Sequence, residues 1–199
     1  TPLVTRKPGG EGQVGLGHRL LAYAVSASGS DWLTWRVRDV ETGEDLPDLI
    51  EWSKFSGAAW LKDGSGFYYS RYEKPEEGLT YASLNQDQKL YFHHLDTPQA
   101  DDMLIYERPD HKDWGFSPEV SHDGRYLVLN VWQGTDTRNR LFYKDLRTDS
   151  AVVELISELE AAYSFVGNDG PVFYFRTNLD APRGRLIAID TTRPDKANW

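Results

Sequence analysis

The serines of this chain are the first candidates for chemistry, because a serine nucleophile needs a recognisable local setting. A serine hydrolase places its nucleophile in Gly-x-Ser-x-Gly, where a sharp strand–turn–helix elbow exposes the hydroxyl to its base. The sequence contains no such pattern, and Ser28-Gly29-Ser30 and Gly64-Ser65-Gly66 are typical of loops. We therefore assign no catalytic residue and expect the isolated chain not to hydrolyse peptides. An enzyme with an unrecognised site is the least favoured alternative.

Cofactor and metal motifs are equally weak. The run from Gly10 to Gly15 matches Gly-x-Gly-x-x-Gly, but a dinucleotide loop needs a strand before it and a helix after it, and the sequence predicts neither. His93 and His94 are adjacent, so in a strand they point to opposite faces and cannot easily share a metal ion. A structural or solvent-facing role is expected for both. The absence of cysteine excludes disulfides and thiolate sites. No cofactor is expected.

Composition narrows the class of protein. The 199 residues are 39% hydrophobic and 27% charged, which is typical of a globular domain rather than a disordered chain. The net charge is −9 and no basic stripe is visible, which argues against a nucleic-acid partner. No apolar run is long enough to span a membrane, and the first eight residues lack the apolar core of a signal peptide. We expect neither a membrane nor a nucleic-acid partner.

An internal repeat is the strongest pattern in the chain. Asp63-Gly64, Asp123-Gly124 and Asp169-Gly170 are each followed by an aromatic or apolar run, and a weaker copy begins at Gly17. Asp-Gly between apolar runs predicts a tight hairpin, because glycine tolerates a positive φ. The four glycines are 47, 60 and 46 residues apart, and the long interval contains a polar insertion at 73–88. A period of about 46 residues indicates the four-stranded blades of a β-propeller.

The strands of these blades are predicted from alternating polarity. Two blades are expected to be complete, at about 56–107 and 115–156, with partial blades before and after them. Residues 1–16 are expected to be a flexible segment and 17–199 the propeller blades of one domain. Residues 157–162 could instead form one helical turn, with Ser157 and Glu160 as a capping box. The predicted inner strands are 58–61, 118–121 and 163–166, the third strands 33–39, 89–95, 140–146 and 185–190, and the outer strands 103–106 and 152–156. The fold class is thus all-β, a partial propeller of three to four antiparallel blades.

Five runs of the chain share a likeness with a known family: Ser26-Ala27-Ser28-Gly29-Ser30-Asp31-Trp32, Lys54-Phe55-Ser56-Gly57-Ala58-Ala59-Trp60, Gln88-Lys89-Leu90-Tyr91, Asp123-Gly124-Arg125-Tyr126 and Asn139-Arg140-Leu141-Phe142-Tyr143-Lys144-Asp145-Leu146. In this order and spacing, and over about residues 20–199, they resemble the propeller of the prolyl oligopeptidases. The resemblance implies a seven-bladed propeller that caps an α/β-hydrolase domain and admits short peptides to a Ser-Asp-His triad, with cleavage after proline. This chain is similar to the middle blades, without the hydrolase domain. The resemblance also implies a cytoplasmic protein.

The resemblance assigns roles to two residues near the first blade. Asp31 matches an acidic residue at the interface with the catalytic domain, where it pairs with an arginine. The alternative for Asp31 is an ordinary loop acid beside Trp32. Phe55 matches an aromatic residue that lines an apolar subsite for the residue upstream of proline. The alternative for Phe55 is an inner-strand aromatic residue of the core.

Two further pocket positions follow from the same resemblance. Thr135 matches one pocket-lining position, and Phe116 or its neighbour Gly115 matches another. The sequence departs from the family at two places nearby: Gly115 stands where a bulkier apolar residue is frequent, and Trp132 stands where an arginine is frequent. Subsite preference is therefore not carried over from relatives.

Two functions are compatible with the sequence. The favoured one is a non-catalytic module of a prolyl oligopeptidase-type serine peptidase, which gates short proline-containing peptides and lines part of their pocket. Its partner is then an α/β-hydrolase domain in the same protein. The alternative is an excised or engineered partial propeller that acts as a scaffold. Open blade edges would let such a protein associate with copies of itself.

Overall fold

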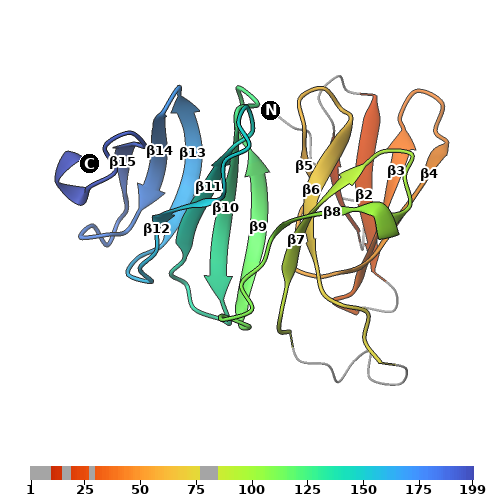
Figure 1. Ribbon diagram of the computed structural model, residues 1–199, viewed down its shortest axis with the longest axis horizontal. Helices are drawn as coiled ribbons and strands as arrows, with labels where there is room; N and C mark the ends of the chain where they lie inside the picture. Colours follow the sequence, from red (N-terminus) through yellow and green to blue (C-terminus); the bar gives the residue numbers. More distant parts are fainter. Residues whose placement is uncertain (1–9, 15–18, 27–29, 77–84) are drawn as a thin grey trace. The chain divides into compact units, whose positions relative to one another are not determined.

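The structure is a computed structural model that describes residues 10–14, 19–26, 30–76 and 85–199, with the backbone alone at 10–14. The strands of this described part form antiparallel sheets whose neighbours follow chain order (Figure 1). Each strand of residues 10–14, 19–26, 30–76 and 85–199 belongs to one sheet, as expected for blades connected in series. The all-β partial propeller predicted from the sequence is therefore confirmed.

The blades are named here in chain order. The first contains β1 Gly10–Val14, β2 Leu20–Ser26, β3 Leu33–Asp39 and β4 Asp45–Ser53. The second contains β5 Ala59–Trp60, β6 Gly66–Arg71, β7 Lys89–His94 and β8 Met103–Tyr106, with the 3₁₀ turn η1 Gln99–Asp101 before β8. The third contains β9 Trp114–Val120, β10 Tyr126–Gln133, β11 Arg140–Asp145 and β12 Val153–Ile156. The fourth contains β13 Tyr163–Asp169, β14 Val172–Thr177 and β15 Arg185–Asp190, followed by the 3₁₀ turn η2 Lys196–Asn198.

A hydrogen bond at the same place in every blade supports the predicted repeat. The amide just after the third strand donates to the carbonyl just before the second strand. The four acceptors are Arg19, Ser65, Arg125 and Pro171, at distances of 2.7, 3.0, 2.7 and 2.9 Å. These acceptors are 46, 60 and 46 residues apart in the sequence. The longer interval contains the β6–β7 connection, where the sequence predicted an insertion.

The predicted Asp-Gly hairpins are present. Gly64, Gly124 and Gly170 have φ values of +73°, +70° and +55°, the left-handed region that glycine enters without a Cβ clash. The preceding aspartate stabilises two of these turns. Asp63 Oδ1 accepts from the Ser65 amide at 2.9 Å, and Asp123 Oδ1 accepts from the Arg125 amide at 3.0 Å.

The first blade differs from its prediction. Residues 10–14 were expected to be flexible, but they form β1 and pair with β2 from Gly10↔Val25 to Val14↔Leu21. The first blade is therefore a complete four-stranded sheet. Residues 1–9, 15 and 16 lie outside the described part, so the boundary predicted at residue 17 stays a prediction. The weak repeat copy at 17–26 is described from residue 19 onward and contains β2.

Two further details concern the end of the chain. The helical turn considered as an alternative for residues 157–162 does not form, and the chain runs from β12 to β13 without regular structure. The last blade was expected to be partial, and among the described residues it has three strands, β13–β15, followed by η2. Within the described part of the chain, no helix is long and apolar enough to cross a membrane.

The described residues divide into two compact units, one up to Pro118 and the other Glu119–Trp199, with the boundary inside β9. In the first unit, strands of the first and second blades bury one shared core around Trp35, Phe67 and Tyr69. In the second unit, Tyr126, Phe173, Phe175 and other side chains of the third and fourth blades form another core. Alternating burial along β2 and β3 reflects the period of two that the sequence predicted.

Candidate functional site

Three connections meet at one end of the first unit. Leu33 at the start of β3 pairs with Ser53 at the end of β4. The Tyr72 amide, just after β6, donates to the Trp52 carbonyl at 2.9 Å. The connections before β3, after β4 and after β6 therefore lie together. We call the residues gathered there the blade-end cluster: Asp31, Trp32, Trp52, Ser53, Lys54, Phe55, Ser56, Tyr72, Asn85 and Gln88.

A lysine of the blade-end cluster lies against one of its aromatic rings. Trp32 packs edge-to-face on Trp52 and Tyr72, with ring centroids 5.7 and 6.0 Å apart. The Lys54 ammonium lies 3.7 Å from the centre of the Trp32 ring and donates to Asn85 Oδ1 at 3.0 Å. Burial lowers the pKa of Lys54, an effect that the Asp31 carboxylate opposes. An ammonium over an indole face in a dry setting is favourable by about 2 kcal/mol. Lys54 thus anchors the connection that carries Phe55.

Phe55 is exposed to solvent, although its neighbours in the sequence are buried. Its side chain is 46% exposed, whereas Ser53, Lys54 and Ser56 are buried. Ser53 Oγ donates to the Ser70 carbonyl at 2.9 Å, and Ser56 Oγ accepts from the Ser70 amide at 2.8 Å. The alternative that Phe55 is a core aromatic residue is therefore wrong.

The backbone of Phe55 is strained. Its φ is +54°, and Trp52 close by has φ +62°. A non-glycine residue in this region costs about 1–3 kcal/mol and persists only where surrounding contacts hold it. The buried hydrogen bonds of Ser53 and Ser56 are such contacts. The site therefore presents an apolar ring on a fixed backbone.

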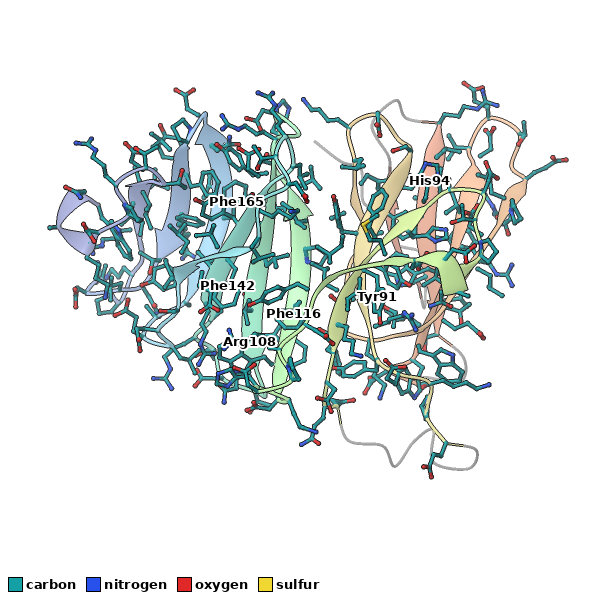
Figure 2. All side chains as sticks on the ribbon, viewed as in Figure 1. Tyr91, His94, Arg108, Phe116, Phe142 and Phe165 are labelled. Atoms are coloured by element: carbon teal, nitrogen blue, oxygen red, sulfur yellow. The ribbon has the colours of Figure 1, made fainter. Side chains whose placement is uncertain are left out.

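Phe116, which with Gly115 was predicted as a pocket-lining position, is a buried residue. It belongs to β9 and is labelled in Figure 2; its ring is 1% exposed and packs edge-to-face on Tyr106 at 5.3 Å. Its neighbour Gly115 is buried as well. Phe116 contributes its main chain to this end of the unit, through hydrogen bonds to Gln88 and Ser70. A role for its ring in a pocket stays a prediction.

Asp31 is exposed in the bend that precedes β3. Its carboxylate favours the charged form of Lys54 and so partly offsets the lowering of that lysine's pKa by burial. An exposed carboxylate at the blade end fits both an interface acid and an ordinary loop acid. The role of Asp31 at an interface therefore stays a prediction.

Thr135 belongs to the second unit, in the turn between β10 and β11, and is exposed. The turn is closed by an ion pair in which Arg138 donates to both carboxylate oxygens of Asp136, at 3.0 and 2.6 Å. Arg138 lowers the pKa of Asp136 to about 2. Of the four predicted site residues, the first unit thus brings together Asp31, Phe55 and the main chain of Phe116. The position of Thr135 relative to them stays a prediction.

Sequence reasoning missed the buried polar residues that hold this end together. Gln88, Ser70 and Lys54 are 2%, 0% and 7% exposed. Lys54 and Gln88 stood in runs that resemble the family, which was the available signal. The burial of Lys54 and Gln88 was not predictable because each lies in a connection, where polar residues are usually solvated; Ser70 lies in β6.

The histidines fulfil the structural role expected of them. His93 is fully buried between two carboxylates, with Nδ1 2.7 Å from Asp102 Oδ1 and Nε2 2.9 Å from Asp48 Oδ1. His94 points to the opposite face and is exposed. Among the residues that the structure describes, no cluster of His, Asp and Glu is arranged to hold a metal ion.

Comparison with known proteins gives a consistent result. Residues 10–199 match the family described as "Prolyl oligopeptidase, N-terminal beta-propeller domain". The chain is 32% identical to prolyl oligopeptidase A of Amanita bisporigera over 89% of its own length and 26% of that protein. It is 34% identical to the prolyl endopeptidase of Elizabethkingia meningoseptica over 90% of its own length and 25% of that protein.

Solved structures agree with these relatives. A structure from a study of two prolyl endopeptidases superposes with a TM-score of 0.82 at 32% identity, covering 95% of this chain and 26% of that one. Prolyl oligopeptidase B from Galerina marginata, bound to a macrocyclization substrate, gives 0.83 at 29% identity, covering 93% and 28%. The chain thus spans about a quarter of the length of the relatives it matches. Because the match extends over residues 10–199, the chain belongs to the prolyl oligopeptidase family and corresponds to its N-terminal β-propeller domain.

Proposed function

We propose that this chain is the propeller module of a prolyl oligopeptidase-type serine peptidase. It gates the access of short proline-containing peptides to an α/β-hydrolase domain in the same protein and supplies part of their pocket. The chain alone is not catalytic, since it has no Gly-x-Ser-x-Gly elbow. By its family we place the protein in the cytoplasm.

The observation that carries this proposal is the presentation of Phe55. An exposed phenylalanine with a positive φ, flanked by buried residues on both sides, is costly for folding alone. Such a ring offers apolar area to a ligand without first having to be ordered, which favours binding. We assign to Phe55 the apolar contact with the residue upstream of proline, with Thr135 and Phe116 as further pocket residues.

The test uses the full-length gene product that contains this chain and two chromogenic peptides. The peptides differ only in carrying leucine or glycine immediately upstream of the proline. We expect Phe55→Ala to reduce the preference for leucine about tenfold in kcat/KM, because one lost apolar contact has about that effect. Leu49→Ala is the matched control, since Leu49 is 41% exposed on β4. An unchanged preference in Phe55→Ala would contradict the assignment.

Asp31 has the second role in this proposal, as a polar contact to the hydrolase domain. Its carboxylate is exposed at the same end of the unit as Phe55. We expect Asp31→Asn in the full-length protein to increase proteolytic cleavage between the domains by more than the small loss of stability in the isolated chain explains, about 0–1 kcal/mol for the lost attraction to Lys54. Equal cleavage in both proteins would leave Asp31 as a loop acid.

Self-association is a second candidate function, favoured by the edge of the fourth blade. In the described part of the chain β15 pairs only with β14, and Leu186 on it is 64% exposed. An open strand edge with an exposed apolar side chain can pair with another copy. Sedimentation at micromolar concentration tests this: a dimer that Leu186→Lys dissociates supports the scaffold, and a monomer contradicts it.

A further inference from the structure

Gln88 lies at the end of the β6–β7 connection, one residue before β7, and is 2% exposed. A buried primary amide is costly unless both its donor and its acceptor are used. Gln88 uses both, and both partners are main-chain groups. Its Nε2 donates to the Lys54 carbonyl at 2.9 Å, and its Oε1 accepts from the Phe116 amide at 2.6 Å.

These two bonds join the connection that carries Phe55 to the start of β9. The Lys54 carbonyl belongs to the peptide unit that leads into Phe55. The Phe116 amide belongs to β9, and Phe116 is, after Phe55, the other predicted pocket residue in the first unit. Lys54 and Phe116 are 62 residues apart in the sequence. The Gln88 side chain thus links two segments that the sequence connects only through the second blade.

Ser70 makes a parallel link between the same two segments. Its amide donates to Ser56 Oγ at 2.8 Å, and its own Oγ donates to the Phe116 carbonyl at 2.7 Å. Phe116 is therefore held at both its amide and its carbonyl. Phe55 is held at the residue before it by Gln88 and at the residue after it by Ser70. The two links clamp both segments against rotation as well as translation.

We propose that Gln88 is a positioning residue of the substrate pocket, which fixes Phe55 relative to β9 and so determines selectivity upstream of proline. This inference rests on the proposed function of Phe55. The physical reason is that a displacement of about 1 Å at a positioning contact can cost about a hundredfold in catalytic efficiency, here expected through weaker binding. The two hydrogen bonds of the Gln88 amide prevent such a displacement before the peptide binds. Loss of these bonds should therefore weaken peptide binding and leave bond cleavage unchanged.

The decisive variant is Gln88→Glu, which keeps the size of the side chain and its acceptor for the Phe116 amide. When ionised, the new carboxylate cannot donate to the Lys54 carbonyl, so only the link toward Phe55 breaks; because burial raises the pKa of a carboxyl group, the comparison is made over a pH series that extends well above that pKa. In the full-length protein we expect about a tenfold loss of preference for leucine over glycine upstream of proline, through KM with kcat unchanged. The double variant with Phe55→Ala should lose no more than Phe55→Ala alone, because both changes remove the same contact.

Gln99 supplies the matched control. It too uses both ends of its amide on the main chain of β4, at the Glu51 carbonyl (3.0 Å) and amide (3.1 Å), but it does not reach β9 or Phe55. We expect Gln99→Glu to leave the preference unchanged. If Phe55→Ala lowers the preference and Gln88→Glu does not, the inference is overturned and the proposed function stands.

If Phe55→Ala leaves the substrate preference unchanged, the proposed function is refuted. A second measurement then still tests the positioning role of Gln88. Hydrogen exchange followed by mass spectrometry reports on residues 52–57 and 114–118 of the isolated chain. Gln88→Met removes both bonds, so we expect faster exchange in both segments than in Gln99→Met, including at the Phe116 amide. Equal exchange in the two variants would overturn the positioning role.

Discussion

His93 illustrates how a charge is accommodated inside a blade. Its ring lies between the carboxylates of Asp48 on β4 and Asp102 just before β8. The Tyr69 hydroxyl donates to Asp102 Oδ2, and the Asp96 amide donates to Asp48 Oδ1 at 2.8 Å. The imidazolium and its two carboxylates form a hydrogen-bonded network that ties the outer strand of the first blade to the second.

Removal of His93 should be strongly destabilising. His93→Leu leaves two carboxylates buried without a counter-charge, and breaking a buried ion pair in this way costs about 3–5 kcal/mol. Urea unfolding of the variant measures the loss. His94→Leu is the control, because His94 is exposed on the opposite face and such substitutions stay within about 0.5 kcal/mol. Similar losses in the two variants would contradict the network.

The network also predicts a pH dependence. Burial alone would lower the pKa of His93, but hydrogen bonds and charge from Asp102 and Asp48 outweigh it and raise the pKa to about 9. A raised pKa means that the folded state binds the proton more tightly than the unfolded state. This contribution to stability is complete below pH 6.5 and is lost as pH rises through about 9. Denaturant midpoints between pH 6 and 10 should fall in the wild type, and the fall should be smaller in His93→Leu.

At the scale of the element, the blade hairpins depend on glycine for two different reasons. Gly170 has φ +55° and open space around the position of a Cβ, so it is needed for its backbone conformation. Gly66 opens β6, and a Cβ there would lie 2.2 Å from the His93 carbonyl oxygen. Gly66 is therefore needed for the close approach of β6 and β7.

These two glycines should respond differently to alanine. Gly170→Ala should cost about 1–2 kcal/mol, the penalty of a left-handed residue with a Cβ. Gly66→Ala should cost more, because the neighbouring backbone has to move as well, and overpacking alone costs about 1–3 kcal/mol. Thermal unfolding of both variants checks the order. A smaller loss in Gly66→Ala would show that β6 and β7 separate easily.

Element prediction succeeded where polarity alternates and failed where it does not. The third strands were predicted within one residue of β3, β7, β11 and β15, because one face of each is buried. β1 was missed because Gly10-Glu11-Gly12-Gln13-Val14 has almost no apolar pattern, and its pairing with β2 decides its structure. β9 extends four residues before its predicted start, since pairing in the sheet prolongs it.

At the scale of the whole molecule, the two units have separate cores. Phe173 is central to the second unit, with ring centroids of Tyr126, Tyr143 and Phe165 at 4.8, 5.3 and 5.6 Å. The first unit has its own cluster around Trp35 and Phe67. A destabilising substitution in one core should therefore lower the stability of its own unit more than that of the other.

Phe173→Ala tests this division. Loss of a buried phenylalanine costs about 3–5 kcal/mol. Hydrogen exchange should accelerate throughout Glu119–Trp199, while the strands β2–β4 and β6–β7 of the first unit keep their protection. Trp35→Ala should give the reverse pattern. Uniform acceleration in both variants would show that the two units unfold as one.

The repeat, the fold class, the family likeness and the absence of a nucleophile elbow could all be predicted from the residues alone. The first two depend on local turn chemistry and on a polarity period of two, which the order of residues along the chain specifies. Three other properties became known from the folded structure: Phe55 is exposed on a strained backbone, Phe116 is buried, and Gln88 links the Lys54 carbonyl to the Phe116 amide. Burial and hydrogen bonding of these residues depend on segments far apart in the sequence, and such contacts cannot be predicted from the polarity pattern of one segment.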